Sequence, residues 1–134
     1  MKRIKCLLVV LTVSFISCST LIAQNKEDVS VKVVNIPSKT GKILLALDQG
    51  NYYGYYAVVD VVDSQAEIKL VNIPNGKYKI YVYHDTNNNW ILDKNDKGIP
   101  VEYCAIQNIE IKEDVRKISV ALENVNAYVN PQNR

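Results

Sequence analysis

The sequence is poor in the residues that carry most protein chemistry, with three cysteines and one histidine among 134 residues. Cys6 and Cys18 lie in the first 23 residues, which have the features of a leader. Cys104 alone remains after it, so an internal disulfide is excluded there. The single histidine, His84, provides no zinc-ligand spacing, and no nucleophile motif is present. We therefore predict that the protein is not an enzyme and that Cys104 is a small buried apolar side chain.

The sequence also lacks a run of basic residues. Its 16 basic and 14 acidic residues give a formal net charge of +2. Lys2, Arg3 and Lys5 belong to the leader, and without them 13 basic residues face 14 acidic ones, a net charge of −1. Binding to a nucleic-acid backbone needs a positive patch. We therefore exclude nucleic acid as a partner.

The only long apolar run lies at the start of the chain, over residues 7–16, after a basic N-terminus. Small residues follow as far as Ala23. This order is typical of a secretory signal, and the run is short for a bilayer-spanning helix. We predict export, to the periplasm, the outer membrane or the outside of the cell.

Two cleavage sites compete within this leader. Cleavage after Ala23 would release a secreted domain, whereas residues 15–18 (Phe-Ile-Ser-Cys) resemble a lipobox that would leave a lipid on Cys18. Phe15 fits the first lipobox position poorly, so we favour cleavage after Ala23. A membrane contact is expected only through a lipid on Cys18. The predicted division is a signal peptide over residues 1–23, a β-domain over 24–124 and a flexible C-terminal tail over 125–134.

The segments between turn residues have the pattern of strands, and none has helical periodicity. Apolar and polar residues alternate clearly in several of them, and Asn75-Gly76 is typical of a hairpin turn. We predict an all-β protein, a single antiparallel β-sandwich of about seven strands. The predicted strands are residues 29–33, 42–47, 57–62, 66–71, 78–83, 105–112 and 117–122.

An Asp/Asn-rich loop follows the strand at residues 78–83. Its oxygen-bearing side chains recur at positions 1, 3, 5 and 9 of a loop, and hard cations such as calcium bind six to eight oxygens presented in this way. We predict a weak calcium site, with a Kd of about 10⁻⁴ M as in extracellular modules. Its ligands would be Asp85, Asn87, Asn89, the Ile91 carbonyl and Asp93, closed by Glu102 or Asp96. The alternative is a loop whose Asn and Asp side chains bond to their own backbone.

Two further functions remain open as alternatives. Four tyrosines lie within residues 52–56, Tyr52, Tyr53, Tyr55 and Tyr56, and would form a carbohydrate- or peptide-binding surface or, as we favour, a strand end that covers the core. His84 and Glu102 would form the acid–base pair of a hydrolase. We interpret His84 instead as a buried, hydrogen-bonded structural residue.

Two motifs together resemble a known family. They are Ile-Pro-Asn-Gly-Lys-Tyr at residues 73–78 and the run from His84 to Glu102, which reads His-Asp-x-Asn-x-Asn-x-x-Leu-Asp and ends in Gly-x-Pro-x-Glu. They are similar to the secreted bacterial family known as domain of unknown function 2141, over residues 29–122. The resemblance implies a transthyretin-like or immunoglobulin-like β-sandwich, export and no settled function. The expected partner is a protein or glycan at the cell envelope.

The sequence departs from the family pattern at two places. Trp90 stands where the family usually has glycine, which allows the sharp turn of a calcium loop. Residues 103–105 read Tyr-Cys-Ala where the family has a Gly-Phe-Ser type of stretch. The loop also resembles calcium loops in the sandwich modules of bacterial surface adhesins. The calcium prediction itself comes from the spacing of the oxygen-bearing residues.

Overall fold

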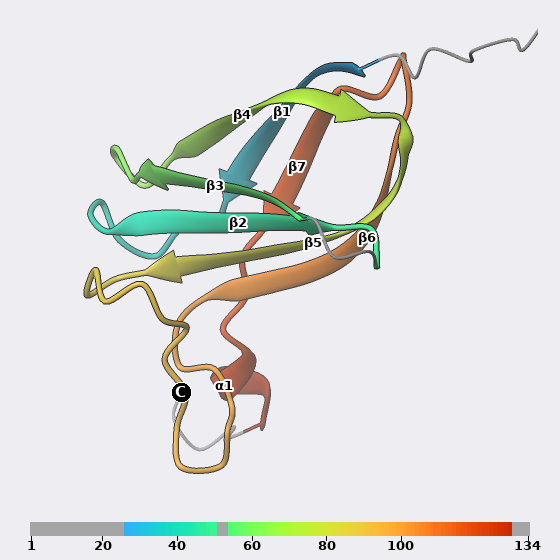
Figure 1. Cartoon of the computed structure of the whole chain (residues 1–134). Coiled ribbons are helices and arrows are strands. Elements are labelled where there is room, and N and C mark those ends of the chain that lie inside the picture. Colours follow the sequence, from blue (N-terminus) through green and yellow to red (C-terminus); the bar gives the residue numbers. More distant parts are fainter. Residues whose placement is uncertain (1–25, 51–53, 130–134) are drawn as a thin grey trace, which may run out of the picture.

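The computed structural model describes residues 26–50 and 54–129, which form two β-sheets packed face to face (Figure 1). One sheet has the order β4-β1-β7, formed by Ala66–Pro74, Lys26–Val34 and Lys117–Ala121. The other has the order β3-β2-β5-β6, formed by Tyr55–Asp60, Lys42–Asp48, Gly76–Asp85 and Cys104–Ile111. The predicted all-β sandwich of about seven strands is therefore confirmed.

The core consists of alternate residues from the facing sides of the two sheets. Val29, Val31 and Val33 of β1 are buried between the sheets, as are Ile43 of β2 and Ile80 of β5. Successive side chains of a strand point to opposite faces, so a period of two in the sequence becomes one buried face. Burying one such side chain contributes about 1.5–3 kcal/mol. The core therefore explains why the alternating segments became strands.

One pairing is parallel, although the sequence predicted an antiparallel sandwich. β1 pairs antiparallel with β4 on one side and parallel with β7 on the other. The parallel register runs from Ser30 opposite Lys117 to Val34 opposite Ala121. Parallel strands need a crossover connection, and here the whole four-stranded sheet lies between β1 and β7 in the chain. Alternation within each segment gives no information about such a distant partner.

The predicted hairpin at Asn75-Gly76 is wrong. β4 pairs with β1, and β5 pairs with β2 and β6, so the chain crosses from one sheet to the other at Asn75. Arg116, in the turn before β7, fixes this crossover by donating to the Ile73 carbonyl at 3.0 Å and to Asn75 Oδ1 at 2.5 Å. Asn-Gly is compatible with many kinds of tight turn. Here the burial of β4 in one sheet and of β5 in the other makes the turn a crossover between the sheets.

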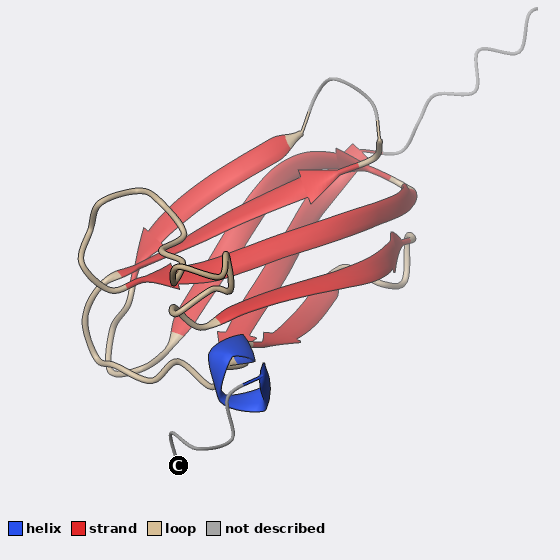
Figure 2. Cartoon of the chain, turned by 90° about the horizontal axis from the view of Figure 1, so that it is seen from below, coloured by secondary structure: helices blue, strands red, loops and turns tan. Residues whose placement is uncertain are grey.

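A short helix, α1 (Val125–Val129), follows β7. A flexible tail was predicted over residues 125–134, and residues 125–129 are helical instead. Asn124 Oδ1 accepts the Ala127 amide at 3.2 Å, and Asn126 accepts a bond from Asn95 of the β5–β6 connection at 3.2 Å. Figure 2 shows the helix at one end of the sandwich, and in Figure 1 it lies beside the β5–β6 connection. Residues 130–134 and the predicted leader over residues 1–23 lie outside the described residues.

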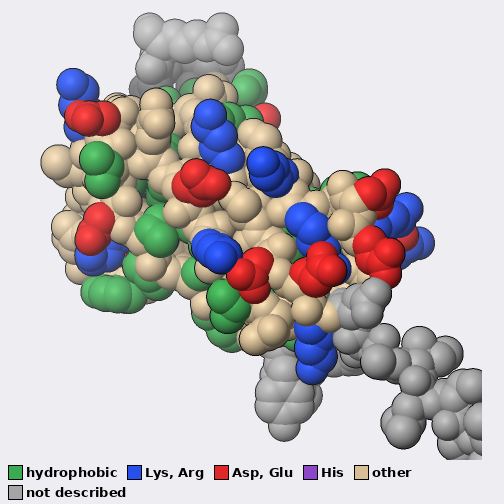
Figure 3. Space-filling view, turned by 90° about the horizontal axis from the view of Figure 1, so that it is seen from above, with side chains coloured by type: hydrophobic (Ala, Val, Ile, Leu, Met, Phe, Trp, Pro, Cys, Tyr) green, Lys and Arg blue, Asp and Glu red, His purple; other side chains and the backbone are tan. Residues whose placement is uncertain are grey.

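The exposed charges are mixed in sign. Figure 3 shows one face of the molecule, on which Lys and Arg side chains are interspersed with Asp and Glu. Two of the ion pairs are Lys42–Asp60 and Lys112–Glu110, and each has at least one side chain that is more than half exposed. Such pairs contribute about 0–1 kcal/mol each. Within the described residues, no helix has the length and apolar character to cross a membrane.

Candidate functional site

The Asp/Asn loop connects β5 to β6 and starts from the centre of the four-stranded sheet. β5 pairs with β2 as far as Asp85, which lies opposite Lys42. His84 and Asp85, the last two residues of β5, are fully buried. β5 is flanked by strands on both sides, so the beginning of the loop is held by a rigid element. This confirms the prediction that the strand before the loop is central.

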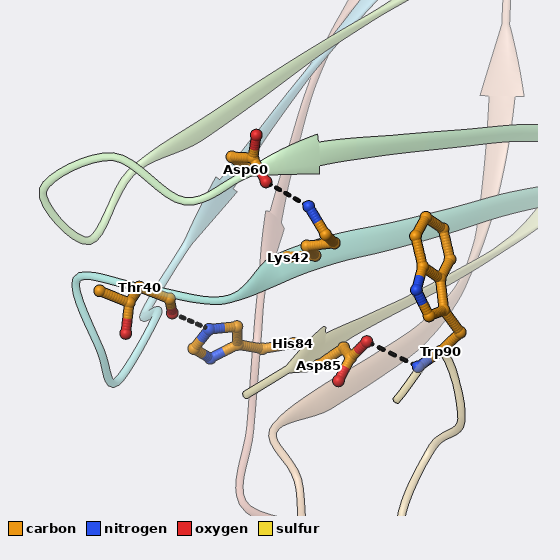
Figure 4. Close-up of polar contacts among 6 residues, drawn as sticks. All are labelled: Thr40, Lys42, Asp60, His84, Asp85 and Trp90. Atoms are coloured by element: carbon orange, nitrogen blue, oxygen red, sulfur yellow. Dashed lines mark hydrogen bonds and ion pairs between the residues drawn. The ribbon is translucent and has the colours of Figure 1, made fainter. Parts of the chain in front are cut away.

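Asp85 holds the first turn of the loop. Its Oδ1 accepts the Asn89 amide at 3.1 Å. Its Oδ2 accepts the Trp90 amide at 2.9 Å, and Figure 4 shows this second bond. A buried carboxylate needs hydrogen-bond donors to replace the water it has lost, and two backbone N–H groups provide them. Asp85 therefore bends the chain over residues 86–90 around its own carboxylate.

Glu102 holds the loop from its other end. It is 5% exposed and accepts three bonds. They come from the Thr86 amide at 2.9 Å, the Thr86 hydroxyl at 3.1 Å and the Asp93 amide at 3.1 Å. One side chain thus ties the beginning, middle and end of the loop together. Glu102 was predicted as an ion ligand, and this clamp was not predicted, because Thr86 and Asp93 lie 16 and 9 residues before Glu102, a spacing that matches no recognisable motif.

The remaining predicted ligands gather on Asp93. Asn87 Nδ2 donates to Asp93 Oδ2 at 2.6 Å, and Asn89 Nδ2 donates to Oδ1 at 3.0 Å. The amide oxygens of the same side chains accept backbone N–H groups, from Asn89 to Asn87 at 3.1 Å and from Ile91 to Asn89 at 2.9 Å. Asp85, Asn87, Asn89 and Asp93 are therefore brought together as the spacing predicted, in a self-bonded form. Among the described residues, no three acidic, histidine or cysteine side chains form a ready-made metal centre.

Trp90 adopts the turn that the family pattern assigns to glycine. Its φ is +66°, in the left-handed region, which costs a non-glycine residue about 1–2 kcal/mol. Its indole ring lies 5.9 Å from the Lys42 ammonium, a cation–π contact beside the Lys42–Asp60 ion pair (Figure 4). Trp90 therefore does not prevent the sharp turn, and its indole ring contacts Lys42 of β2.

His84 is buried and hydrogen-bonded, as the sequence predicted. Its imidazole is fully buried, and Nε2 donates to the Thr40 carbonyl at 2.8 Å (Figure 4). Nδ1 is buried and finds no hydrogen-bond partner among residues 26–50 and 54–129. Gly41 packs directly against this ring. Glu102, the partner of His84 in the hydrolase alternative, is buried as well, and that alternative stays a prediction.

The tyrosine cluster is only partly described, because Tyr52 and Tyr53 lie outside the described residues. Tyr55 begins β3 and packs edge-to-face on Tyr78 at 6.2 Å, against the core. Tyr56 is 77% exposed. One ring therefore covers the core edge and one faces solvent, so the carbohydrate- or peptide-binding alternative stays a prediction. Cys104 is a buried free thiol, as predicted.

Tyr83 lies on β5 beside the carboxylates of the loop. Burial raises its pKa above 10.0, and the negative charges of Asp85, Glu102 and Asp93 raise it further. Burial likewise raises the pKa of Tyr78 and of the Cys104 thiol. In each case the fold favours the neutral, protonated group over the anion.

Alkaline pH is expected to unfold the protein through these groups. A raised pKa in the folded state leaves stability complete below the ordinary values of 9.0 for the thiol and 10.0 for the phenols, and stability falls as pH rises through the raised pKa values. Urea midpoints measured from pH 8 to 11 should fall only at the alkaline end. Replacing Tyr83 with phenylalanine should make that fall shallower, and an unchanged slope would contradict the role of Tyr83.

A comparison with protein families finds a match over residues 31–124 to the model described as "Uncharacterized protein conserved in bacteria (DUF2141)". The chain belongs to this family. The DUF2141 match extends from within β1 past the end of β7, so it contains the end of β1, every later strand and the complete Asp/Asn loop. The resemblance drawn from the sequence motifs is confirmed. A search of curated proteins and a search of solved structures each found no match.

Proposed function

We propose that this DUF2141 protein is an exported, non-enzymatic β-sandwich module whose Asp/Asn loop binds calcium. The bound ion would stiffen the connection between β5 and β6. The observation that carries the proposal is the convergence of the Asn87 and Asn89 amides on Asp93, at 2.6 and 3.0 Å. The side chains at positions 3, 5 and 9 of the loop therefore meet at one point. These side chains carry carboxylate and carboxamide oxygens, the ligand atoms that a hard cation prefers.

Calcium binding requires a rotation of the two amides. Turning a carboxamide by 180° exchanges its oxygen and nitrogen, so Asn87 and Asn89 would each direct an oxygen toward the ion held by Asp93. The backbone bonds that these oxygens now accept would be lost, which lowers the net affinity. The Ile91 carbonyl and an Asp85 oxygen would complete the ligand set, while Glu102 keeps the loop closed. The expected site is weak and suited to the millimolar calcium outside cells.

Export is proposed from the sequence of the leader. The basic N-terminus, the apolar run over residues 7–16 and the small residues before Ala23 support it. The first strand begins at Lys26, shortly after the favoured cleavage site, so cleavage there would leave every described strand complete. The proposed partners are a protein or glycan of the cell envelope, and the proposed role is structural or binding.

Millimolar calcium is expected to raise the thermal unfolding midpoint by several degrees over that in excess EDTA. An ion that binds only the native state adds RT ln(1 + [L]/Kd), about 1.4 kcal/mol at ten times Kd. The protein should be recovered after export from a bacterial host expressing the full chain, and its intact mass reports where the leader was cut. Calcium should also lower the pKa of Tyr83, because a cation offsets the carboxylates that raise it.

Asp93→Asn is the decisive variant for this measurement. Asp93 meets the two amides through its side chain, whereas its backbone N–H and carbonyl bond to Glu102 and Val101. The substitution therefore removes the charge of one ligand and leaves the backbone bonds of Asp93 to Glu102 and Val101 in place. It should abolish the rise of the unfolding midpoint in calcium. Asp114→Asn, the same charge change in an exposed turn, should preserve it. A wild-type midpoint that calcium leaves unmoved would show that the loop is self-bonded turn structure only.

A further inference from the structure

The two sheets end in four edge strands, and one of them is long and lacks residues that block pairing. β3 lies against β4 and closes one side of the sandwich (Figure 1). On the other side β7 has five residues and begins with Lys117. β6 has eight residues, Cys-Ala-Ile-Gln-Asn-Ile-Glu-Ile, with no proline, glycine or basic residue. Natural proteins usually protect an exposed edge by such residues or by a very short strand.

The backbone of β6 offers free hydrogen-bonding groups on its outer side. The amide and carbonyl of Cys104 bond to the carbonyl and amide of Glu123, both at 3.0 Å, on the side away from β5. In an antiparallel ladder the direction of these groups alternates along the strand. Ile106, Asn108 and Glu110 therefore direct their N–H and C=O groups to the same outer side. In the part of the chain that the structure describes, β6 pairs with β5 and, outside that ladder, only at Cys104.

The side chains along this edge leave room for another strand. Ile106 is 65% exposed and lies opposite Tyr81 of β5. A groove of about 410 Å³ follows the beginning of β6, lined by Pro100, Ile106, Ala121 and Val125 among others. A strand added at this edge would cover Ile106 and place side chains in the groove.

We propose that this edge pairs with β6 of a second copy of the chain, in antiparallel orientation about a two-fold axis at Asn108. The open stretch begins after Cys104, where Glu123 occupies the outer side, and ends with the strand at Ile111. Its middle residue is Asn108, whose backbone groups point outward. A symmetric pair therefore fills the open stretch completely. Asn108 lies opposite its own copy, and Ile106 lies opposite Glu110 of the second copy.

The charges at the ends of this pairing are complementary. Glu123 occupies the place opposite Cys104, which in this register is the place that Lys112 of the second copy approaches. Lys112 and Glu123 are both exposed. Lys112 also pairs with Glu110 of its own copy at 3.1 Å, an exposed contact that the dimer extends to Glu123, and the two-fold axis repeats the arrangement at the other end. No two like charges lie opposite each other, because Glu110 faces an isoleucine. Charge complementarity of this kind fixes register and excludes other partners. The pairing makes one continuous eight-stranded sheet from two copies.

Sedimentation equilibrium on protein recovered after expression of the full chain tests the proposal. At about 0.1 mM, a complex with a Kd of about 10 µM is mostly dimer. Ile106→Lys and Asn108→Pro should each raise the dimer Kd at least about a hundredfold, because one places a charge and the other removes an N–H at the edge. Ser119→Lys, on the outer face of the other sheet, should leave the Kd unchanged.

The two charge reversals test the register itself. Glu123→Lys and Lys112→Glu should each raise the dimer Kd about tenfold, and the double variant should restore it. Both residues are exposed, so the variants should fold, which circular dichroism checks. A wild-type monomer at about 0.1 mM overturns the proposal. A dimer that Ile106→Lys and Asn108→Pro leave intact overturns it as well, because its interface would lie elsewhere.

Discussion

Gly41→Ala is expected to lower the free energy of unfolding by about 3–5 kcal/mol. Gly41 has a φ of +102°, which a side chain disfavours. A Cβ at this position would lie 2.7 Å from the Asp85 carbonyl oxygen and 2.7 Å from His84 Nε2. Both atoms belong to buried residues at the end of β5, and the carbonyl cannot rotate away as a surface side chain would. The substitution therefore strains its own backbone and displaces the start of the Asp/Asn loop.

Gly98→Ala is the matched control, measured by the same urea unfolding. Gly98 also has a positive φ, +74°, but a Cβ there meets no atom within 4 Å. Its expected cost is the backbone strain alone, about 1–2 kcal/mol. The difference between the two variants isolates the close approach of Gly41 to His84 and Asp85. Equal losses would show that this contact is unimportant for stability.

The second large effect is expected from Glu102→Gln, which should cost about 2–3 kcal/mol. Each oxygen of the carboxylate accepts an N–H group, from Thr86 and Asp93, and a glutamine places an NH₂ group against one of them. That N–H loses its acceptor in a site that is 5% exposed, so water cannot easily replace it. Charge-assisted bonds are also replaced by weaker neutral ones.

Asp60→Asn provides the comparison for Glu102. It also converts a carboxylate to an amide and removes the charge of an ion pair, with Lys42, but its side chain is 75% exposed. The expected loss is below about 1 kcal/mol. Native-state hydrogen exchange should show faster exchange of the Thr86 and Asp93 amides in the Glu102 variant only. If those amides stay protected, a role of Glu102 in closing the loop is contradicted.

The strands were predictable from the sequence because each one depends on the alternation of apolar and polar residues within its own segment. Alternation in residues 29–33 and 66–71 gives one apolar face whatever the partner strand is, and burial of that face is what the fold uses. The pairing was not predictable in the same way. The parallel β1–β7 contact and the crossover at Asn75 depend on packing between distant segments. A strong local turn signal at Asn75-Gly76 was therefore assigned to the wrong kind of reversal.

The candidate site was predictable in its composition and not in its hydrogen bonds. The spacing of Asp85, Asn87, Asn89 and Asp93 was enough to predict that they lie close together, since alternate residues of a curled loop face inward. It did not reveal that Asp85 accepts the Asn89 and Trp90 amides, because that depends on the left-handed backbone at Trp90. A large aromatic residue gives no sequence signal for this conformation. The sequence of the loop was therefore compatible both with a calcium site and with a loop whose side chains bond to its own backbone.

The parallel contact of β1 with β7 also determines when the domain can fold. β1 lies in the middle of its sheet, between β4 and the last strand of the chain. The sheet is therefore incomplete until nearly the whole chain is available, and its closure joins residues far apart in sequence. Such non-local contacts make folding slow, because loop entropy is lost before they form. A chain that is synthesised in order would thus complete the β4-β1-β7 sheet only when its last strand arrives, and until then one face of the other sheet lacks its partner.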